Sequence, residues 1–320
     1  MMNRRTFIAG ASTLLAAPLT VEAQQAKVPR IGVLLTVDLE RTQARLREEL
    51  RGLGYVEGQN VRIEFRLVPA GQADRLPDLA AELVRLNVDV IVAQFTLAAT
   101  AAKAATTAIP IVMAPAGNPI ETGLIASLAQ PGGNITGVAG LASELGGKSV
   151  QLMREMVPSA RRVAALLNAK DPFAKPLLEQ IQLAARTVAF DIRPVRVSGG
   201  EELEAAFSQM SRERIEAVIV QPSLPSKRAA ELALKHRLPA VSLARWFAEE
   251  GGLMAYGWDA TNIVHQVASY VDRILKGVKP ADLPVEQPTK FELVINRKTA
   301  KALKLTIPNS LLLRADHIID

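Results

Sequence analysis

The chain has 320 residues, of which 49% are hydrophobic and 22% are charged, as expected for a well-packed globular protein of about two domains. Its formal net charge of +6 comes from basic residues interleaved with acidic ones, so no nucleic-acid partner is expected. The lack of cysteine excludes disulfides, thiolate metal sites and a cysteine nucleophile. His236, His265 and His317 share no metal-ligand spacing, so we expect neither a metal nor a cofactor.

Residues 1–23 are predicted to be an export signal that is removed. The segment NRRTFI at residues 3–8 is similar to the twin-arginine signal, and the apolar stretch at residues 7–19 is too short to span a membrane. Val21 and Ala23 place small residues at the −3 and −1 positions before Gln24. We therefore expect a mature protein that starts near Gln24 in a bacterial periplasm. A cytosolic protein with a fortuitous Arg-Arg pair is the alternative.

Past Gln24, short apolar runs typical of strands alternate with patterns typical of helices. Strands are predicted at residues 30–36, 61–67, 88–93, 109–114 and 135–138. Helices are predicted at residues 38–54, 79–86, 97–107 and 118–130, with turns at residues 94–96 and 115–117. The strict alternation at residues 61–67 indicates a strand near a sheet edge. This order of elements predicts an α/β fold with a doubly wound parallel sheet.

The helix expected after Asn118 has a clear start signal. Asn118 suits the N-cap, Pro119 the first helical position and Glu121 the third, which together form a capping box. A helix N-terminus at a strand end presents free backbone N–H groups that favour anions and carboxylates. We therefore expect Asn118 to hold an oxygen-rich group of a ligand, or to act as a cap alone.

The second half of the chain repeats the first. Residues 31–36, 90–92 and 109–112 correspond to residues 163–168, 218–220 and 238–241, at offsets of 132, 128 and 129 residues from Ile31 to Val163, Val90 to Val218 and Pro110 to Pro239. Three strands displaced by nearly one offset predict two similar α/β lobes.

Ligands of open α/β sheets lie beyond the carboxyl ends of the strands, so two facing lobes predict a shared cleft. The candidate ligand-binding residues at these ends are Thr36, Asp38, Gln94, Phe95, Thr96, Ala116, Gly117, Asn118, Asn168, Phe173, Gln221, Ser223, Arg245, Trp246, Tyr256, Trp258 and Asp259. Arg245 beside Trp246 suits a ligand carboxylate, with a solvated arginine as the alternative. Asp38 and Asp259 suit a ligand amine or helix caps, while Asn168 and Ser223 are also turn formers.

Aromatic residues concentrate at these strand ends. Thirteen residues are Phe, Trp or Tyr, and Phe7 lies in the signal. Five of the remaining twelve lie at or just beyond predicted strand ends: Phe95, Phe173, Trp246, Tyr256 and Trp258. This placement predicts an apolar or aromatic solute held between rings. A sugar stacked on tryptophan and inter-lobe packing without a ligand are the alternatives.

Four segments resemble a bacterial family of ABC-transporter substrate-binding proteins related to tryptophan- and tyrosine-binding receptors. They are residues 109–140, LASELGGK at 141–148, GGLMAYG at 251–257 and KPADLPVEQPTKFELVIN at 279–296. The resemblance covers residues 28–320 and implies a type I periplasmic-binding fold, in which two lobes joined by three crossovers close on a small solute. Members of the family often carry Asp where this chain has Asn118.

The crossovers implied by this resemblance divide the mature chain into lobe one, residues 28–138 plus 258–278, and lobe two, residues 139–257 plus 279–320. The leading function is a periplasmic receptor of an ABC importer, with an aromatic or branched amino acid or a similar small carboxylate as the expected solute. We expect a monomer with a membrane permease as its partner. A receptor that presents its ligand to a sensor kinase is the alternative. An enzyme is not expected, because the chain lacks Gly-x-Ser-x-Gly, a phosphate loop and His-Glu-x-x-His.

Overall fold

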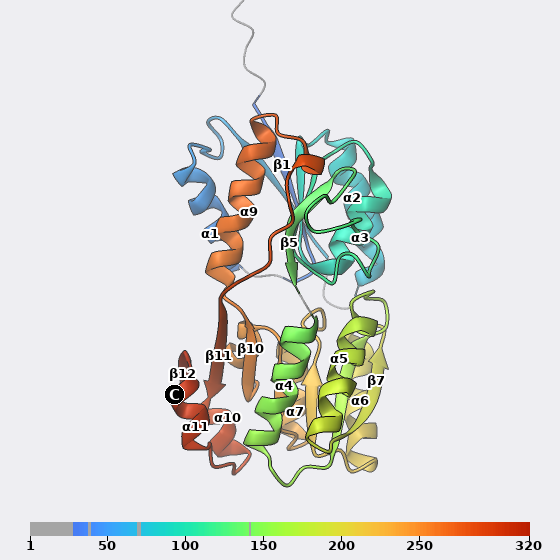
Figure 1. Ribbon diagram of the computed structural model, residues 1–320, viewed down its shortest axis with the longest axis vertical. Helices are drawn as coiled ribbons and strands as arrows, with labels where there is room; N and C mark the ends of the chain where they lie inside the picture. The colour runs from blue at the N-terminus through green and yellow to red at the C-terminus, as the bar shows by residue number, and fades with distance from the viewer. Residues whose placement is uncertain (1–27, 38–39, 69–71, 141) are drawn as a thin grey trace, which may run out of the picture.

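The computed structural model describes residues 28–37, 40–68, 72–140 and 142–320. The chain folds into two α/β lobes, one above the other, each with helices on both faces of a sheet (Figure 1). Lobe one contains the strands Arg30–Leu35 (β1), Arg62–Leu67 (β2), Val90–Ala93 (β3), Ile111–Gly117 (β4) and Ile135–Gly140 (β5). Its helices are Glu40–Gly52 (α1), Leu76–Arg85 (α2), Phe95–Ala105 (α3) and Ala260–Leu275 (α9).

Lobe two contains the remaining strands and α-helices. Its strands are Arg162–Asn168 (β6), Asp191–Val197 (β7), Ala217–Val220 (β8), Ala240–Ser242 (β9), Met254–Trp258 (β10), Phe291–Asn296 (β11) and His317–Ile319 (β12). Its helices are Ala142–Met156 (α4), Ala174–Thr187 (α5), Leu203–Arg212 (α6), Ser226–Lys235 (α7), Arg245–Glu249 (α8), Arg297–Ala302 (α10) and Asn309–Arg314 (α11).

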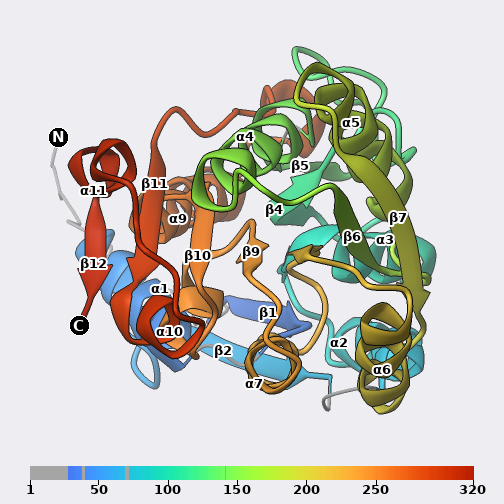
Figure 2. The same ribbon diagram turned by 90° about the horizontal axis from the view of Figure 1, so that it is seen from below.

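The two sheets confirm the predicted α/β fold. The first has the order β2-β1-β3-β4-β5 and is parallel throughout, with β2 at its edge. The second has the order β12-β11-β10-β9-β8-β6-β7, in which only the β10–β11 pair is antiparallel among the described strands. Figure 2 shows the second sheet and its helices from below. The order β7-β6-β8-β9-β10 repeats the order of the first sheet.

Strand register corrects one of the predicted equivalences. Ile31 pairs with Val90 in the first sheet, and Val163 pairs with Ala217 in the second. Val90 is therefore equivalent to Ala217, at an offset of 127 residues (217 − 90), and not to Val218. These strands are buried on both faces, so their sequences carry no alternation that fixes the register.

Each sheet separates two apolar layers. In lobe one, α2 and α3 cover one face through residues such as Leu79, Leu83 and Ala98, while α1 and α9 cover the other. In lobe two, α4 and α5 pack on one face, and α6 and α7 on the other. Within the described residues, no helix combines the length and the apolar character that crossing a membrane requires.

The helix predicted after Asn118 is absent, and this prediction is wrong. Strand β4 continues through the expected turn to Gly117, with a register shift between Met113 and Ala116. Residues 118–123 then form turns in which Asn118 has a φ of 42° and Gly123 a φ of 74°. Both values lie in the left-handed region, which an α-helix does not use. Strand β4 is therefore followed by irregular turns and not by a helix N-terminus.

Three passages connect the lobes, all close together in Figure 1. The first follows β5, and the second lies between β10 and α9. The third comes later in the chain than the sequence indicated. Glu286 still pairs with β5, donating its N–H to Gly137 O and accepting from Ala139 N, so the chain passes to lobe two between Glu286 and the start of β11.

Candidate functional site

The carboxyl ends of the strands in the two lobes face one another and touch at several points. The rings of Phe95 in lobe one and Trp246 in lobe two have centroids 5.9 Å apart. The ring of Phe173 in lobe two lies on the backbone of Gly117, where a Cβ atom would overlap it. Lys170 Nζ lies 2.6 Å from Asp74 Oδ2 across the lobes. The lobes are therefore in a closed arrangement.

The first candidate site is an enclosed space that we call the aromatic cavity. It has a volume of about 80 Å³ and lies between α1, α9 and the strand ends of lobe one, with Trp246 of lobe two as its lid. Its aromatic walls are Phe65, Phe95, Trp246 and Trp258. Its polar walls are Thr42, Gln43 and Gln94, and among the described residues no charged side chain lines it. Such a space suits an uncharged ring.

Phe95 is held in an unusual conformation at this cavity. It begins α3 immediately after Gln94, so the predicted turn is one residue long. Its φ of 63° lies in the left-handed region, which bulky residues rarely adopt. Non-glycine residues in this region concentrate at ligand sites. The strained backbone directs the ring of Phe95 toward Trp246.

A second space, the strand-end cavity, lies on the α2 and α3 side of Gln94. It has a volume of about 180 Å³ and draws its walls from both lobes. Its polar lining comes from Thr36, Asn168, Ser198 and Ser223, opposite aliphatic residues such as Leu76 and Leu97. The Lys170–Asp74 ion pair connects the two lobes near it, since Ala73 is also part of its wall.

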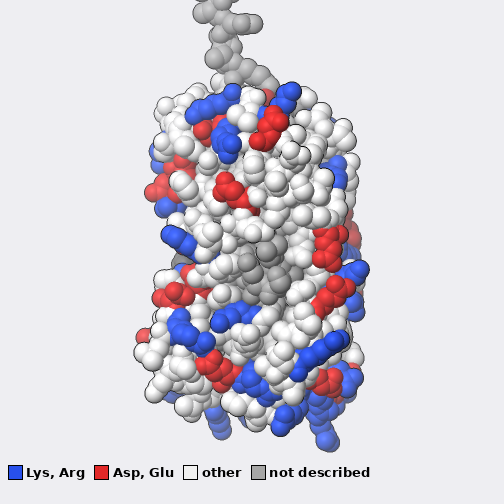
Figure 3. All heavy atoms as spheres, viewed as in Figure 1, with Lys and Arg blue, Asp and Glu red and all other residues white. Residues whose placement is uncertain are grey.

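A wider surface hollow of about 670 Å³, the charged groove, adjoins the aromatic cavity. The two share the lining residues Thr42, Trp246, Ala260 and Val264, so they lie side by side. The charged residues of the groove are Glu40, Arg45, Arg245, Glu249, Glu250, Asp259 and Glu292. Figure 3 shows basic and acidic residues interspersed over one face of the molecule.

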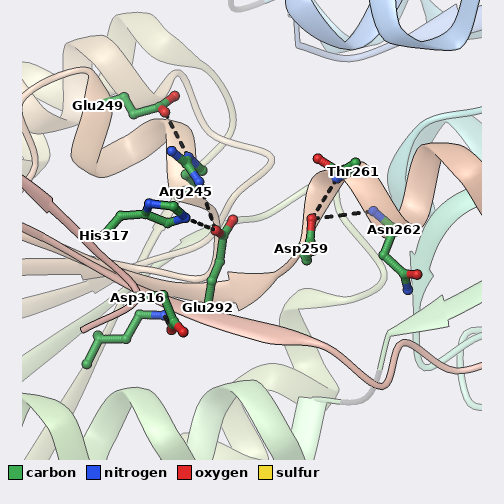
Figure 4. A network of polar contacts seen from close by, with 9 residues as sticks. Arg245, Glu249, Asp259, Thr261, Asn262, Glu292, Asp316 and His317 are labelled. Carbon is green, nitrogen blue, oxygen red and sulfur yellow. Dashed lines mark hydrogen bonds and ion pairs between the residues drawn. The ribbon is translucent and has the colours of Figure 1, made fainter. Parts of the chain in front are cut away.

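Arg245 is already paired with two carboxylates in this groove (Figure 4). Its Nε donates to Glu249 Oε1 at 2.8 Å, and its Nη1 donates to Glu292 Oε2 at 2.9 Å. His317 Nε2 lies 3.4 Å from the same oxygen of Glu292. Burial raises the pKa of the Glu292 carboxyl, although Arg245 and His317 oppose this shift. A ligand carboxylate would therefore share Arg245 with Glu249 and Glu292.

Asp259 acts as the N-cap of α9. Its Oδ1 accepts from Thr261 N at 2.8 Å and from Asn262 N at 3.4 Å. Figure 4 shows this carboxylate between the helix start and the Glu292 side chain. The cap occupies one of its two oxygens in the described contacts, so Asp259 combines a structural role with a negative charge at the groove.

A buried carboxylate lies at the end of β6 in lobe two. Asp171 is 5% exposed, and its Oδ2 accepts from Gln221 Nε2 and from Ser223 Oγ, each at 2.7 Å. Its Oδ1 accepts from Phe173 N at 3.0 Å. Burial raises the pKa of this carboxyl, while the three hydrogen bonds oppose the shift. Asp171 thereby fixes the loop that carries Phe173.

The structure divides the sequence-predicted residues among these features. Gln94, Phe95, Trp246 and Trp258 line the aromatic cavity. Thr36, Asn168 and Ser223 line the strand-end cavity, while Arg245 and Asp259 line the groove. Asp38 lies outside the described residues. The residues that line none of these three spaces are Thr96, Ala116, Gly117, Asn118, Phe173, Gln221 and Tyr256.

Several of this last group have structural contacts instead. Thr96 Oγ1 accepts from Gly117 N at 2.9 Å, which ties α3 to β4. Asn118 Nδ2 donates to Glu121 Oε2 at 3.0 Å, so its side chain does not cap a helix. Tyr256 stacks on Phe291 within lobe two, with ring centroids 5.9 Å apart.

Phe65 and Asp171 are two of the residues that sequence reasoning missed at the cleft. Phe65 lines the aromatic cavity, although its place inside an alternating strand indicated a core residue. Asp171 was not selected within the 168–173 loop. Its signal was the Asp-Pro pair just after a predicted strand, which is typical of a turn with a side-chain hydrogen bond. In the described residues, no group of three or more His, Cys, Asp or Glu side chains is placed to hold a metal ion.

Comparisons with known proteins agree with this architecture. Residues 30–319 match the family model described as ABC transporter substrate binding protein, and the chain belongs to this family. It is thus a substrate-binding protein and not an enzyme. It is 25% identical over 303 residues to a tyrosine-binding protein from Clostridioides difficile, an alignment that covers 91% of this chain and 86% of that protein.

Two solved structures are also similar. A conserved domain protein from Vibrio cholerae has a TM-score of 0.84 and 27% identity, covering 91% of this chain and all of that one (100%). An ABC domain from Streptococcus pneumonia in complex with L-Trp has a TM-score of 0.82 and 26% identity, covering 91% of this chain and 99% of that one. The architecture is the type I periplasmic-binding fold.

Proposed function

We propose that this protein is a periplasmic receptor of an ABC importer, and that its lobes close on an aromatic or branched amino acid or a similar small carboxylate. The observation that carries this proposal is the aromatic cavity, whose ring-lined walls come from both lobes. Separating the lobes would remove Trp246 of lobe two from the cavity walls that Phe65 and Phe95 of lobe one form. Closure and ligand enclosure are therefore the same movement.

The cavity and the groove together fit the two ends of an amino acid. An apolar or aromatic side chain enters the uncharged cavity, and the charged end remains in the groove beside Asp259 and Arg245. Asp259 offers a carboxylate to an amine. Arg245 offers its guanidinium to a ligand carboxylate, shared with Glu249 and Glu292. The similarity to one protein solved with L-Trp and to another named for tyrosine supports this solute class.

The expected partner is an ABC permease in the inner membrane, reached by a monomeric receptor after export. Export follows from the twin-arginine pattern at residues 3–8, with cleavage near Ala23. N-terminal sequencing of the periplasmic protein is expected to start near Gln24, and a protein that retained Met1 would contradict export by this route. Presentation of the ligand to a sensor kinase is the alternative use of the same fold. Solute uptake that is lost when the receptor gene is deleted distinguishes import from sensing.

A thermal-shift screen tests the ligand class. The panel contains amino acids, aromatic acids and sugars, with tryptophan fluorescence as a second readout, since Trp246 and Trp258 both line the cavity. A ligand at 100 times its Kd stabilises the folded protein by about 2.7 kcal/mol. We expect this shift with an aromatic or branched amino acid or a similar carboxylate. Stabilisation by sugars alone would overturn the proposed class.

A further inference from the structure

The two tryptophans of the chain lie on the same cavity but differ in their hydrogen bonding. Trp246 Nε1 donates to Ser226 Oγ at 3.0 Å. Trp258 Nε1 is buried and has no hydrogen-bond partner in the part of the chain that the structure describes. Both rings line the aromatic cavity. The unpartnered donor therefore belongs to a residue of the candidate ligand site.

The ring of Trp258 is fixed in place. It lies on the backbone of Gly140, where a Cβ atom would overlap its six-membered ring. It also packs against the apolar layers of both lobes, next to residues such as Ile263 and Phe291. A buried donor without a partner is costly, and nearly all such groups in folded proteins are satisfied.

The rest of the cavity wall offers little to replace a missing partner. Gln94 Oε1, an amide acceptor in this wall, already accepts from Thr36 N at 2.9 Å and Val37 N at 3.0 Å. Most other lining residues are aliphatic, such as Val33, Leu46 and Val267. The aromatic cavity is thus largely apolar, and the N–H group of Trp258 has no hydrogen-bond partner among the described residues.

We propose that Trp258 Nε1 is a ligand-binding donor that selects an aromatic solute whose ring carries an oxygen acceptor, such as a phenol. This inference rests on the proposed function, since it requires an aromatic solute in the cavity. A phenyl ring leaves the N–H unsatisfied. An indole also leaves it unsatisfied, because its own N–H is a donor and not an acceptor. A site built to bond a ligand hydroxyl discriminates strongly against the analogue that lacks it.

The test compares the affinities of L-tyrosine and L-phenylalanine, which differ only in the ring hydroxyl, by titration calorimetry. The proteins are wild type, Trp258→Phe and the control Tyr55→Phe, each checked for folding by its melting temperature. Tyr55 lines none of the three spaces, and its hydroxyl donates to Asp272 Oδ1 at 3.0 Å. In wild type we expect tyrosine to bind roughly 10- to 100-fold more tightly. This preference is expected to vanish in Trp258→Phe and to persist in Tyr55→Phe, which removes an aromatic donor that lies outside the cavity and already has a partner.

Each result is decisive. Equal affinities in wild type would overturn the inference and leave the proposed function intact, because both solutes would still bind. A preference for tyrosine that survives in Trp258→Phe would also overturn it, since another group would then bond the hydroxyl. If neither amino acid binds wild type, and 3-phenylpropionate and its 4-hydroxy analogue also fail to bind, the aromatic ligand class is wrong and the inference fails with it.

Discussion

Gln94 and Gln221 occupy equivalent positions in the two lobes and make equivalent hydrogen bonds. Gln94 Oε1 accepts from Thr36 N at 2.9 Å, and Gln221 Oε1 accepts from Asn168 N at 3.0 Å. Each bond joins the end of one central strand to the start of the loop after its neighbour. The two sites also differ, since Gln94 Oε1 accepts a second bond from Val37 N and Gln221 Nε2 donates to the buried carboxylate of Asp171.

The hydrogen bonds of Gln94 and Gln221 predict which of the two substitutions lowers the stability of the protein more. Gln94→Met leaves the N–H groups of Thr36 and Val37 without their acceptor, which is expected to lower the free energy of unfolding by about 1–3 kcal/mol. Gln221→Met is expected to cost more, because it also removes a hydrogen bond to the charge of Asp171. Urea denaturation measures both values.

The control is Gln59→Met, at an exposed position in a surface turn, and its effect is expected to stay within about 0.5 kcal/mol. Similar losses for all three variants would show that the two inward-facing glutamines have no special role at the strand ends.

The repeat was visible in the sequence because buried strands and their order are local and periodic features. Residue pairs such as Ile31 and Val163 share an apolar pattern at a fixed offset. The register of Val90 was not visible, because a strand buried on both faces carries no alternation. The sequence already placed Gln94 and Gln221 after corresponding strands, and the strand pairing gives them the same offset of 127 residues (221 − 94) as Val90 and Ala217.

The prediction of a helix after Asn118 was wrong because it relied on a local signal alone. Its capping box is a local signal, but tertiary packing determines the conformation of this segment. Leu124 and Ile125 are buried in the layer beneath α3, and positive φ values at Asn118 and Gly123 bring them there. Phe65 was missed at the cavity because an alternating strand does not indicate what covers each of its faces.

Lobe closure depends on the absence of a side chain at Gly117. A Cβ atom there would overlap the ring of Phe173 from the other lobe, and φ at Gly117 is not positive, so alanine fits the backbone itself. Gly117→Ala is therefore expected to leave lobe one folded and to disfavour closure by about 1–3 kcal/mol, or roughly 10- to 100-fold in ligand affinity. Small-angle scattering is expected to show a larger radius of gyration with ligand present.

Two further variants test whether the overlap between residue 117 and the ring of Phe173 is what disfavours lobe closure. Gly52→Ala, at a position where an added Cβ meets nothing within 4 Å, is expected to close and bind as wild type does. Adding Phe173→Leu to Gly117→Ala is expected to restore part of the affinity by making room for the new methyl group. A double variant no better than Gly117→Ala would show that the contact between these residues does not limit closure.

The buried carboxylate of Asp171 predicts a pH dependence of stability. Burial raises the pKa of this group above its unfolded value of about 3.9. Its contribution to stability is therefore fully present below that unfolded value and is lost as the pH rises through the folded pKa. The free energy of unfolding of wild type minus that of Asp171→Asn is expected to fall as the pH rises from about 4 toward 7. The subtraction cancels every other titrating group, so a difference that rises with pH would contradict a raised pKa.

Asp259 offers the sharpest separation of a structural role from ligand binding. Its Oδ1 caps α9 through Thr261 N and Asn262 N, and its charge faces the groove. Asn caps a helix about as well as Asp does, so Asp259→Asn is expected to keep the melting temperature close to that of wild type. Asp259→Ala is expected to lose about 1 kcal/mol of stability, because the cap is removed.

We expect the affinity for an amino-acid ligand to depend on the negative charge of residue 259 and not on its role as a helix cap. If the Asp259 carboxylate receives the amine of the ligand, both variants bind an amino acid about tenfold more weakly or worse, since a hydrogen bond to a charged group contributes about 1.5–3 kcal/mol. The matched desamino acid, 3-phenylpropionate in place of phenylalanine, is then expected to bind wild type and Asp259→Asn equally. Wild-type affinity for the amino acid in Asp259→Asn, combined with the stability loss in Asp259→Ala, would assign Asp259 to the helix cap alone. Calorimetry and thermal melts on the same three proteins provide both readouts.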